Sequence, residues 1–478
     1  MDIDKILHEK FGFEQFRPGQ EAVIRDVITG KDTLAILPTG VGKSLCYQLP
    51  AYVLPGTVLI VSPLVALMED QVAIMKKNGE KRVVALNSFL SFSNKKRILA
   101  ELGRYKFIFI SPEMLLRKNM VMLLRTLELS LIVVDEAHCI SQWGFDFRPD
   151  YLRIGELFGQ LNRPSVLALT ATADDKVVAD IIQYLQLQSP AIHRQSLDRP
   201  NISYSIIKVD NETLKTEWIK ERVTETVGPG IIYVASRKRA DELAVTLREL
   251  GVSVASYHAG KEQEDRAFIQ EQFITGEMSW ICATNAFGMG IHKDDIRQVI
   301  HEHVPQAIAG YIQEVGRAGR DGEQSAATLL FTPDDEGRMR FIVQDDIPQE
   351  WEIRHYESCI AENIPAEEAA ERAQISETGK RVIDYYRERM PIEEVIQRMA
   401  ELIQDKEVQL QKILRLVRSE RCIREEILLF FGEYCDSSPE FCCSVCGTAD
   451  GLWLERQKPI VSDKPKLDWE KRLTKLLG

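Results

Sequence analysis

The sequence predicts an α/β fold with two tandem parallel-sheet domains, followed by a mainly helical region. In the first 345 residues, short apolar runs rich in Val and Ile alternate with helical or turn segments, as they do in parallel sheets. After residue 345 the sequence becomes charged and helix-rich, and five of the nine cysteines crowd into residues 422–446. We therefore expect domains at 1–205 and 206–345, a helical and cysteine-containing region at 346–450, and a C-terminal tail at 451–478.

Each half of the α/β part contributes one set of expected strands. The first set lies at 33–37, 57–62, 106–110, 131–135 and 165–169, and the second at 230–234, 253–257, 280–283, 298–301 and 328–331. In the helical region, residues 357–373 and 380–418 have the pattern of amphipathic helices, with a break near Pro391. We expect the charges of these helices to lie on solvated faces.

The composition indicates an intracellular protein that does not enter a membrane. The chain has 478 residues, of which 45% are hydrophobic, but no apolar run reaches the roughly 18 residues of a membrane helix. No signal-peptide pattern is present at the N-terminus. The net charge of −12 argues weakly against nucleic acid as a partner, although a few local cations and backbone amides can still bind phosphates. We expect a cytoplasmic location, with association to the nucleoid if the source is bacterial.

Residues 37–44, with the sequence Leu-Pro-Thr-Gly-Val-Gly-Lys-Ser, have the features of a phosphate-binding loop. They follow the apolar run 33–36 and precede a helical pattern. Gly40 and Gly42 let backbone N–H groups approach phosphates, Lys43 can reach the β- and γ-phosphates of a nucleotide, and Ser44 can ligate Mg²⁺. The strict consensus has Gly where this chain has Leu37, so the loop is a variant of that consensus.

Two adjacent acids, Asp135 and Glu136, directly follow the apolar run 131–134. In a parallel sheet, ligands bind beyond the carboxyl ends of the strands. We expect Asp135 to complete the Mg²⁺ shell with Ser44, and Glu136 to orient or deprotonate an attacking water. Together with the phosphate loop, the acids predict a site for ATP hydrolysis.

These motifs, with others in the same order, resemble superfamily 2 helicases and, within them, the RecQ DNA helicases. The resemblance covers roughly residues 5–345 and resumes at 412–447. Besides the phosphate loop and Asp-Glu-Ala-His at 135–138, it rests on the segments at 16–20, 62–71, 141–151, 169–173, 283–290 and 313–322. It implies two RecA-like lobes and an ATP-dependent helicase that moves 3′→5′ on single-stranded DNA. Tailed or branched duplex DNA in repair and recombination would be its substrate, and single-strand-binding or other repair proteins its partners.

The resemblance also implies roles for four residues outside the loop and the acids. Gln20 has an amide that can both donate and accept, which suits the edge of adenine, and Arg17 can stack on the base. Arg317 and Arg320 lie three residues apart and are expected to project from the second lobe onto the γ-phosphate. An arginine inserted there can contribute about 10³–10⁵ in rate.

Residues 141–151 are expected to couple bound DNA to the ATP site. Trp143, Phe145 and Phe147 can stack on unpaired bases, and Arg148 adds a cation. RecQ-like proteins usually carry His where this chain has Phe145. We therefore expect a polar link between bound DNA and the acids to be missing here.

The clustered cysteines predict a structural zinc site, because closely spaced thiols in a reducing compartment bind Zn²⁺ more often than they form disulfides. The expected ligands are Cys422, Cys442, Cys443 and Cys446, with Cys435 in place of Cys442 as the alternative. The 32 residues after Cys446 are too few for the winged-helix and C-terminal helical DNA-binding modules of longer RecQ proteins. We therefore expect a short RecQ form.

The leading hypothesis is a DNA helicase that uses ATP and Mg²⁺ and contains structural Zn²⁺. Two alternatives stay open at this point. One is an RNA helicase of the Asp-Glu-Ala-His type, and the other is a DNA-binding or strand-annealing protein in which ATP acts only as a conformational switch.

Overall fold

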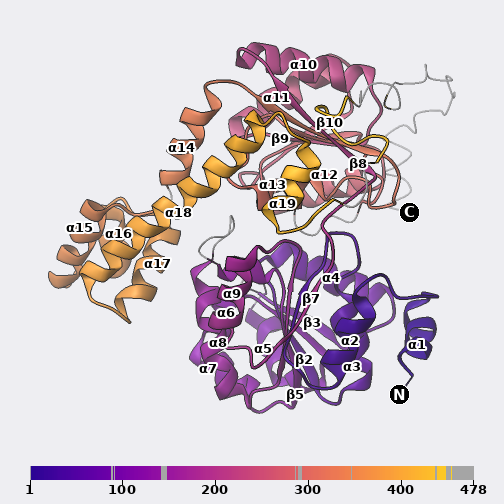
Figure 1. Cartoon of the computed structure of the whole chain (residues 1–478). Coiled ribbons are helices and arrows are strands. Elements are labelled where there is room, and N and C mark those ends of the chain that lie inside the picture. Colours follow the sequence, from indigo (N-terminus) through magenta and orange to yellow (C-terminus); the bar gives the residue numbers. More distant parts are fainter. Residues whose placement is uncertain are drawn as a thin grey trace, which may run out of the picture.

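The computed structural model describes residues 2–87, 90, 92–141, 148–285, 287–288, 293–345, 347–435, 439–447 and 454. The chain forms two α/β lobes, each around a parallel sheet, and a group of helices that stands out beside them (Figure 1). No helix in the described ranges combines the length and the apolar character that a membrane span requires.

Lobe 1 is built on a seven-stranded parallel sheet with the order β3-β4-β2-β5-β6-β1-β7. Its central strands are apolar and buried along their whole length, because helices cover both faces of the sheet. The strands are β1 (Thr33–Ile36), β2 (Thr57–Val61), β3 (Val83–Leu86), β4 (Phe107–Ile110), β5 (Leu129–Val134), β6 (Ser165–Thr170) and β7 (Ala191–Arg194).

The helices of lobe 1 connect these strands. They are α1 (Ile3–Ile6), α2 (Gln20–Ile28), α3 (Leu45–Val53), α4 (Val65–Lys77), α5 (Phe92–Ala100), α6 (Pro112–Leu115), α7 (Lys118–Leu124), α8 (Ile154–Phe158) and α9 (Asp175–Tyr184). Short 3₁₀ turns lie between them at η2 (Leu102–Arg104), η3 (Ala137–Ile140), η4 (Pro149–Arg153) and η5 (Gly159–Leu161), and the π-helical turn η1 (Leu7–Phe11) follows α1.

Lobe 2 has a six-stranded parallel sheet with the order β10-β11-β9-β12-β13-β8. The strands are β8 (Ile202–Lys208), β9 (Gly230–Tyr233), β10 (Val254–Tyr257), β11 (Trp280–Ala283), β12 (Gln298–His301) and β13 (Ser325–Phe331). The helices are α10 (Glu212–Glu225), α11 (Arg237–Glu249), α12 (Gln263–Ile274) and α13 (Ile308–Val315).

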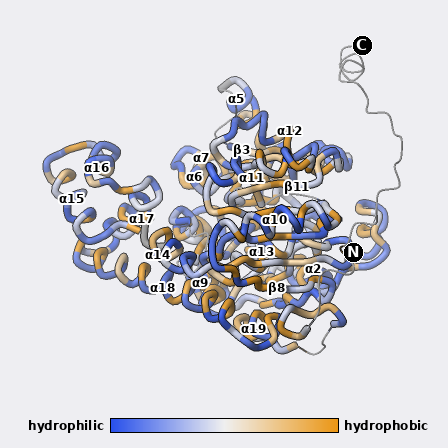
Figure 2. The backbone as a smooth tube through the Cα atoms, turned by 90° about the horizontal axis from the view of Figure 1, so that it is seen from above, coloured by the Kyte–Doolittle hydropathy of each residue, from blue (hydrophilic) through white to orange (hydrophobic). Residues whose placement is uncertain are grey.

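The C-terminal helices form what we call the arm, which comprises α14 to α18. These are α14 (Asp335–Asp345), α15 (Glu350–Ala361), α16 (Ala366–Arg372), α17 (Glu377–Arg387) and the long α18 (Ile392–Arg418), and α19 (Ile423–Phe430) follows them. Figure 2 shows hydrophilic and hydrophobic residues alternating along the arm helices, as expected of amphipathic helices that bury one face.

The predicted fold class, with two parallel-sheet lobes and a mainly helical C-terminal region, is confirmed. All the expected strands are present, and β3, β7 and β8 are additional. β8 crosses the expected boundary between 205 and 206, since it begins at Ile202 and pairs with β13. The helix expected at 357–373 is wrong, because Asn363 at φ 63° and the following Pro365 separate α15 from α16. The break near Pro391 is confirmed, since that residue precedes α18.

Candidate ATP site and cysteine cluster

The residues predicted to bind and hydrolyse a nucleotide meet in one cleft between the two lobes. The cleft has a volume of about 720 Å³. Because lobe 2 supplies two of its cations, the complete site exists only when the lobes face each other. Lobe 1 lines it with Arg17, Gln20, Gly40, Gly42, Lys43, Ser44, Asp135 and Glu136, and lobe 2 with Arg317 and Arg320.

The phosphate loop connects the end of β1 to the start of α3, whose N-cap is Ser44. Gly40 and Gly42 have φ angles of 87° and 79°, a conformation that favours glycine. A Cβ atom on Gly40 would lie 3.1 Å from Cγ of Arg320, so the second lobe packs closely over the loop. The loop thus places its glycines, Lys43 and Ser44 along the cleft at the start of α3, the arrangement that phosphate binding requires.

The two acids lie just beyond the end of β5. Glu136 adopts the left-handed conformation at φ 48°, which is uncommon for a residue with a side chain and is typical of functional sites. Burial raises the pKa of Asp135, and the neighbouring Glu136 carboxylate raises it further. Burial also opposes a charge on Glu136, but the positive charges around it, first that of Lys43, hold its pKa below the ordinary value. The pair therefore carries its negative charge mainly on Glu136.

Polar contacts join Glu136 to the end of β6, which lies between β1 and β5 in the sheet. Nδ1 of His138 lies 3.0 Å from Oγ1 of Thr170 and 3.4 Å from Oε2 of Glu136. The backbone N–H of Leu37 donates to the carbonyl oxygen of Thr170 at 3.0 Å. Thr170 therefore links the phosphate loop to the acids.

The two arginines follow α13 and approach the site from lobe 2. Oγ1 of Thr39 in the phosphate loop donates to the carbonyl oxygen of Gly316 at 2.8 Å, which ties the lobes together next to Arg317. Arg317 is buried, donates to the Gly288 carbonyl oxygen, and is one of the charges that lower the pKa of Glu136. Burial, together with the charge of Arg317, lowers the pKa of Arg320 to about 10. Both arginines thus line the cleft from the side of lobe 2.

Gln20 and Arg17 contact the phosphate loop. Nε2 of Gln20 donates to the carbonyl oxygens of Val41, at 2.7 Å, and Gly42, at 3.1 Å, while Oε1 accepts from the backbone N–H of Arg17 at 2.8 Å. A side-chain N–H of Arg17 donates to the Gly40 carbonyl oxygen. These two residues therefore hold the loop in place, and their contact with adenine stays a prediction.

The sequence reasoning missed Phe13, which lines the same cleft and is 51% exposed. An aromatic side chain at the mouth of a nucleotide site can stack on a base. Its signal in the sequence is weak, since an apolar residue close to Phe11 and Phe16 predicts core packing. The exposure shows that Phe13 does not pack in the core.

Three of the four residues predicted to couple DNA to the ATP site, Trp143, Phe145 and Phe147, lie outside the described residues. The fourth, Arg148, is anchored by its backbone N–H to the Cys139 carbonyl oxygen at 2.9 Å. Its side chain donates to the carbonyl oxygen of Pro63 at 2.8 Å. Arg148 thus connects residues 141–151 to residues 62–71.

The predicted zinc ligands come together as a group. The four sulfur atoms of Cys422, Cys442, Cys443 and Cys446 lie within 4.8 Å of one another, with neighbouring Sγ atoms 3.4 to 3.8 Å apart. Tetrahedral Zn²⁺ with Zn–S bonds of 2.3 Å separates its sulfurs by about 3.8 Å, so the group fits the ion. Cys435, the alternative ligand, is not part of it. The cluster is held against β8, because the backbone N–H of Ser444 donates to the Tyr204 carbonyl oxygen at 2.8 Å.

Comparison with known proteins shows the family to which the chain belongs. The Bacillus subtilis (strain 168) protein named probable ATP-dependent DNA helicase RecS is 40% identical over 489 residues, which cover 100% of this chain and 98% of the relative. The Pasteurella multocida (strain Pm70) ATP-dependent DNA helicase RecQ is 42% identical over 333 residues, which cover 69% of this chain and 52% of the relative. The chain belongs to the RecQ family.

Two family models match the α/β part of this RecQ-family protein. A model described as DEAD/DEAH box helicase matches residues 17–181, and one described as helicase conserved C-terminal domain matches residues 212–322. The solved structure of the DEAD-box helicase Mss116 has a TM-score of 0.60 at 19% identity, covers 86% of this chain and 92% of its own, and supports the fold. The two α/β lobes are thus the RecA-like lobes of an ATP-hydrolysing helicase of superfamily 2.

Proposed function

We propose that this RecQ-family protein is a DNA helicase that moves 3′→5′ along single-stranded DNA and separates tailed or branched duplexes in repair and recombination. The observation that carries the proposal is the arrangement of Arg317 and Arg320 over the cleft that contains Asp135 and Glu136. Because the arginines belong to lobe 2 and the acids to lobe 1, hydrolysis requires a closed cleft. A cycle of hydrolysis then alternately closes and opens two lobes along a strand.

The residues of the cleft have different roles in phosphoryl transfer. Lys43 and the loop amides bind the β- and γ-phosphates, and Ser44 and Asp135 supply the oxygen ligands for Mg²⁺. Bound Mg²⁺–ATP supplies the reacting phosphate and a divalent charge next to it. Glu136 orients the attacking water, for which its negative charge and buried position are suited.

Arg317 and Arg320 stabilise the charge that develops on the γ-phosphate oxygens. Arg320 keeps a positive charge at neutral pH, since even its lowered pKa stays at about 10. The hydrogen bond between Thr39 and Gly316 holds the lobes in register at this point. Closure and transition-state stabilisation therefore depend on the same contact between the lobes.

The base is proposed to lie between Phe13 and Arg17, with Gln20 reading its edge. Gln20 now binds the carbonyl oxygens of Val41 and Gly42, so recognition of adenine would exchange these bonds for bonds to the base. Such an exchange would release the phosphate loop only when the correct nucleotide is present. This gives Gln20 a role in sensing as well as binding ATP.

DNA is proposed to contact residues 141–151 and to act on the ATP site through Arg148, Pro63 and the acids. The RecS and RecQ relatives are named DNA helicases, which favours DNA over RNA as the substrate. Zn²⁺ is proposed to bind the four-cysteine group and to stabilise the end of the chain against β8. We also propose a cytoplasmic location and contact with single-strand-binding or other repair proteins.

The test is ATP hydrolysis with and without single-stranded DNA, beside unwinding of duplexes with a 3′ or a 5′ tail. Stimulation by DNA and unwinding of the 3′-tailed duplex are expected. Stimulation by RNA oligomers and not by DNA would favour an RNA helicase. Hydrolysis that is insensitive to DNA, with annealing in place of unwinding, would contradict the helicase proposal, and unwinding of the 5′-tailed duplex alone would contradict the polarity.

A further inference from the structure

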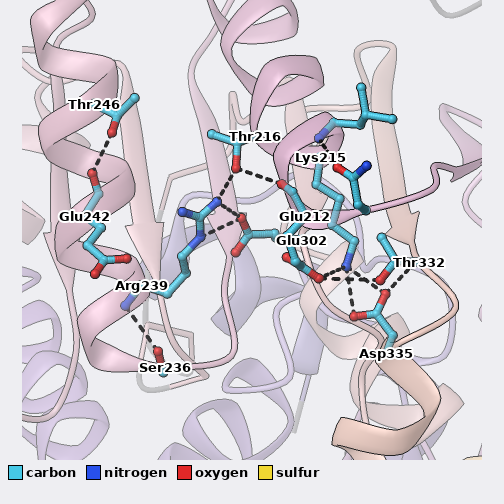
Figure 3. Close-up of polar contacts among 12 residues, drawn as sticks. Glu212, Lys215, Thr216, Ser236, Arg239, Glu242, Thr246, Glu302, Thr332 and Asp335 are labelled. Atoms are coloured by element: carbon cyan, nitrogen blue, oxygen red, sulfur yellow. Dashed lines mark hydrogen bonds and ion pairs between the residues drawn. The ribbon is translucent and has the colours of Figure 1, made fainter.

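The first helix of the arm is anchored to lobe 2 by a buried ion pair. Its first residue, Asp335, accepts hydrogen bonds from Nζ of Lys215 at 2.8 and 2.7 Å, and the two side chains are only 4% and 1% exposed. Figure 3 shows this pair, together with the polar contacts in which Arg239 binds Glu302 at the end of β12. Breaking a buried ion pair is strongly unfavourable, so the start of α14 (Asp335–Asp345) is fixed to lobe 2.

Helix α18 (Ile392–Arg418) extends from lobe 2 to the other helices of the arm. Its second half packs on α13 and α14, and its apolar residues from Leu410 to Val417 belong to the core of lobe 2. In its first half, Val395, Met399 and Leu402 share an apolar cluster with lobe 1 and with α15 to α17. One continuous helix therefore connects lobe 2 to the arm helices α15 to α17 (Figure 1).

On lobe 1 the arm docks through α17 (Glu377–Arg387), which packs on the turn η4 (Pro149–Arg153). The junction has a buried apolar part, in which Ile383 and Tyr386 of α17 share one cluster with Leu152 of lobe 1, and an ionic part with complementary charges. The ion pairs join Arg381 to Asp150 at 3.0 Å and to Glu113 at 3.8 Å, Arg389 to Glu156 at 2.7 Å, and Glu388 to Arg153 at 3.4 Å.

The turn η4 also reaches the ATP site. The Oη of Tyr151, next to Asp150, donates to the backbone carbonyl oxygen of Asp135 at 3.0 Å. At the start of η4, Arg148 binds the Cys139 and Pro63 carbonyl oxygens. A side chain that holds η4 in place therefore also holds the backbone of a predicted Mg²⁺ ligand.

We propose that Arg381 and Arg389 are positioning residues that dock the arm on lobe 1 when the cleft is closed, and so align Asp135 for hydrolysis. The closed state is the one described, because Thr39 of lobe 1 binds Gly316 of lobe 2 in the same structure in which the arm is docked. Docking and closure therefore favour each other. The inference rests on the proposed ATP-driven cycle and adds a second contact between the lobes, remote from the nucleotide, that controls it.

The ion pairs of the docking contact are partly open to solvent. The paired side chains of Arg381 and Asp150 are 41% and 21% exposed, so water and salt screen their attraction. Each such pair shifts an equilibrium by about fivefold at most. These ion pairs thus add a small and salt-dependent bias to the apolar contact between the arm and lobe 1.

The experiment is a charge exchange across the junction. Arg381→Glu and Asp150→Arg are made singly and together, and kcat and KM for ATP are measured with single-stranded DNA at about 50 mM and about 300 mM salt. Each single variant is expected to lower kcat/KM by about 2- to 5-fold at low salt, mainly through a higher KM for ATP. The combined variant is expected to lose less than the product of the two single effects, since opposite charges face each other again across the junction, although Glu113 and Glu377 then repel the carboxylate introduced at position 381.

Arg372→Glu is the matched control, because Arg372 is similarly exposed and pairs with Glu368 on its own helix α16. It is expected to leave kcat, KM and their salt dependence unchanged. Arg389→Gln, a neutral change at the second pair, provides an independent test if a charge reversal fails to fold. It is expected to raise KM in the same direction.

A combined variant as impaired as the product of the single variants would overturn the proposal. Single variants with unchanged kcat and KM at low salt would also overturn it, and so would an equal effect in the control. These outcomes leave the proposed function intact. An unaltered protein without DNA-stimulated hydrolysis would instead contradict the proposed function, before any variant is compared.

Discussion

A methyl group on Gly316 tests whether the two lobes must meet at the phosphate loop. A Cβ atom there would lie 2.2 Å from Oγ1 of Thr39, whereas ordinary contacts begin at 3.4 Å. Gly316→Ala therefore forces the lobes apart by about 1 Å at the residue next to Arg317. Because a misplacement of about 1 Å at reacting groups can reduce the rate about 100-fold, we expect kcat to fall by about that factor. ATP binding should change much less, since lobe 1 carries the phosphate loop.

The same contact predicts that a second substitution rescues the first. Thr39→Ala removes the clashing oxygen and leaves the Thr39 Cβ position 3.5 Å from the new methyl group, which is an ordinary contact. Thr39→Ala alone loses one hydrogen bond and should cost about 2- to 10-fold in kcat. The double variant should match Thr39→Ala and be faster than Gly316→Ala.

The assay is single-turnover hydrolysis with saturating single-stranded DNA, beside the affinity for a fluorescent ATP analogue. Gly337→Ala is the control, because no atom lies within 4 Å of the added Cβ and its backbone lies in a helix. A Gly316→Ala protein that hydrolyses at the unaltered rate would refute the reasoning. A double variant as slow as Gly316→Ala would show that the damage has a different cause.

Three further predictions concern the acid, the cysteines and the buried ion pair. Glu136→Gln should lower the rate of single-turnover hydrolysis by about 10²–10⁴-fold while ATP still binds. A normal rate would mean that another residue orients the attacking water. Cys446→Ser should abolish zinc binding, measured by metal analysis, and lower the midpoint of unfolding. Cys435→Ser should keep the full zinc content. The reverse result would mean that Cys435, and not Cys446, is a zinc ligand. Lys215→Met should cost about 3–5 kcal/mol in denaturant unfolding because it strands the buried Asp335 carboxylate, and a loss below about 1 kcal/mol would contradict this.

The sequence was sufficient where a short local pattern determines the structure. The apolar run before the phosphate loop predicted β1, and the run before Asp135 predicted β5, because buried parallel strands have few other interpretations at that length. The edge strand β7 was missed, since alternate residues of Ala191–Arg194 are exposed and the segment lacks an apolar run. β8 was missed because it begins inside the segment assigned to the preceding domain.

The sequence predicts which residues line the candidate site, but not which contacts they make with one another. Every predicted ATP-site residue lines the cleft, because the motifs have fixed positions at strand ends and helix starts. The contact of Gln20 with the phosphate loop, and that of Tyr151 with the Asp135 backbone, depend on how distant segments meet. Phe13 was missed for a different reason, since apolar periodicity does not distinguish a core aromatic from one at the mouth of a cleft.

The contacts of the arm with lobe 1 could not be predicted from the sequence either. The sequence predicted solvated charges on these helices, but Arg381 of α17 and Arg389, which follows α17, pair with acids of lobe 1. A helix of 27 residues such as α18 is about 40 Å long, so a rotation of about 3° at its lobe 2 end moves its far end by about 2 Å. That displacement would lengthen the 3.0 Å contact between Arg381 and Asp150 beyond hydrogen-bonding distance. A small opening of the cleft is therefore sufficient to break this ion pair, which lies next to the turn that holds Asp135.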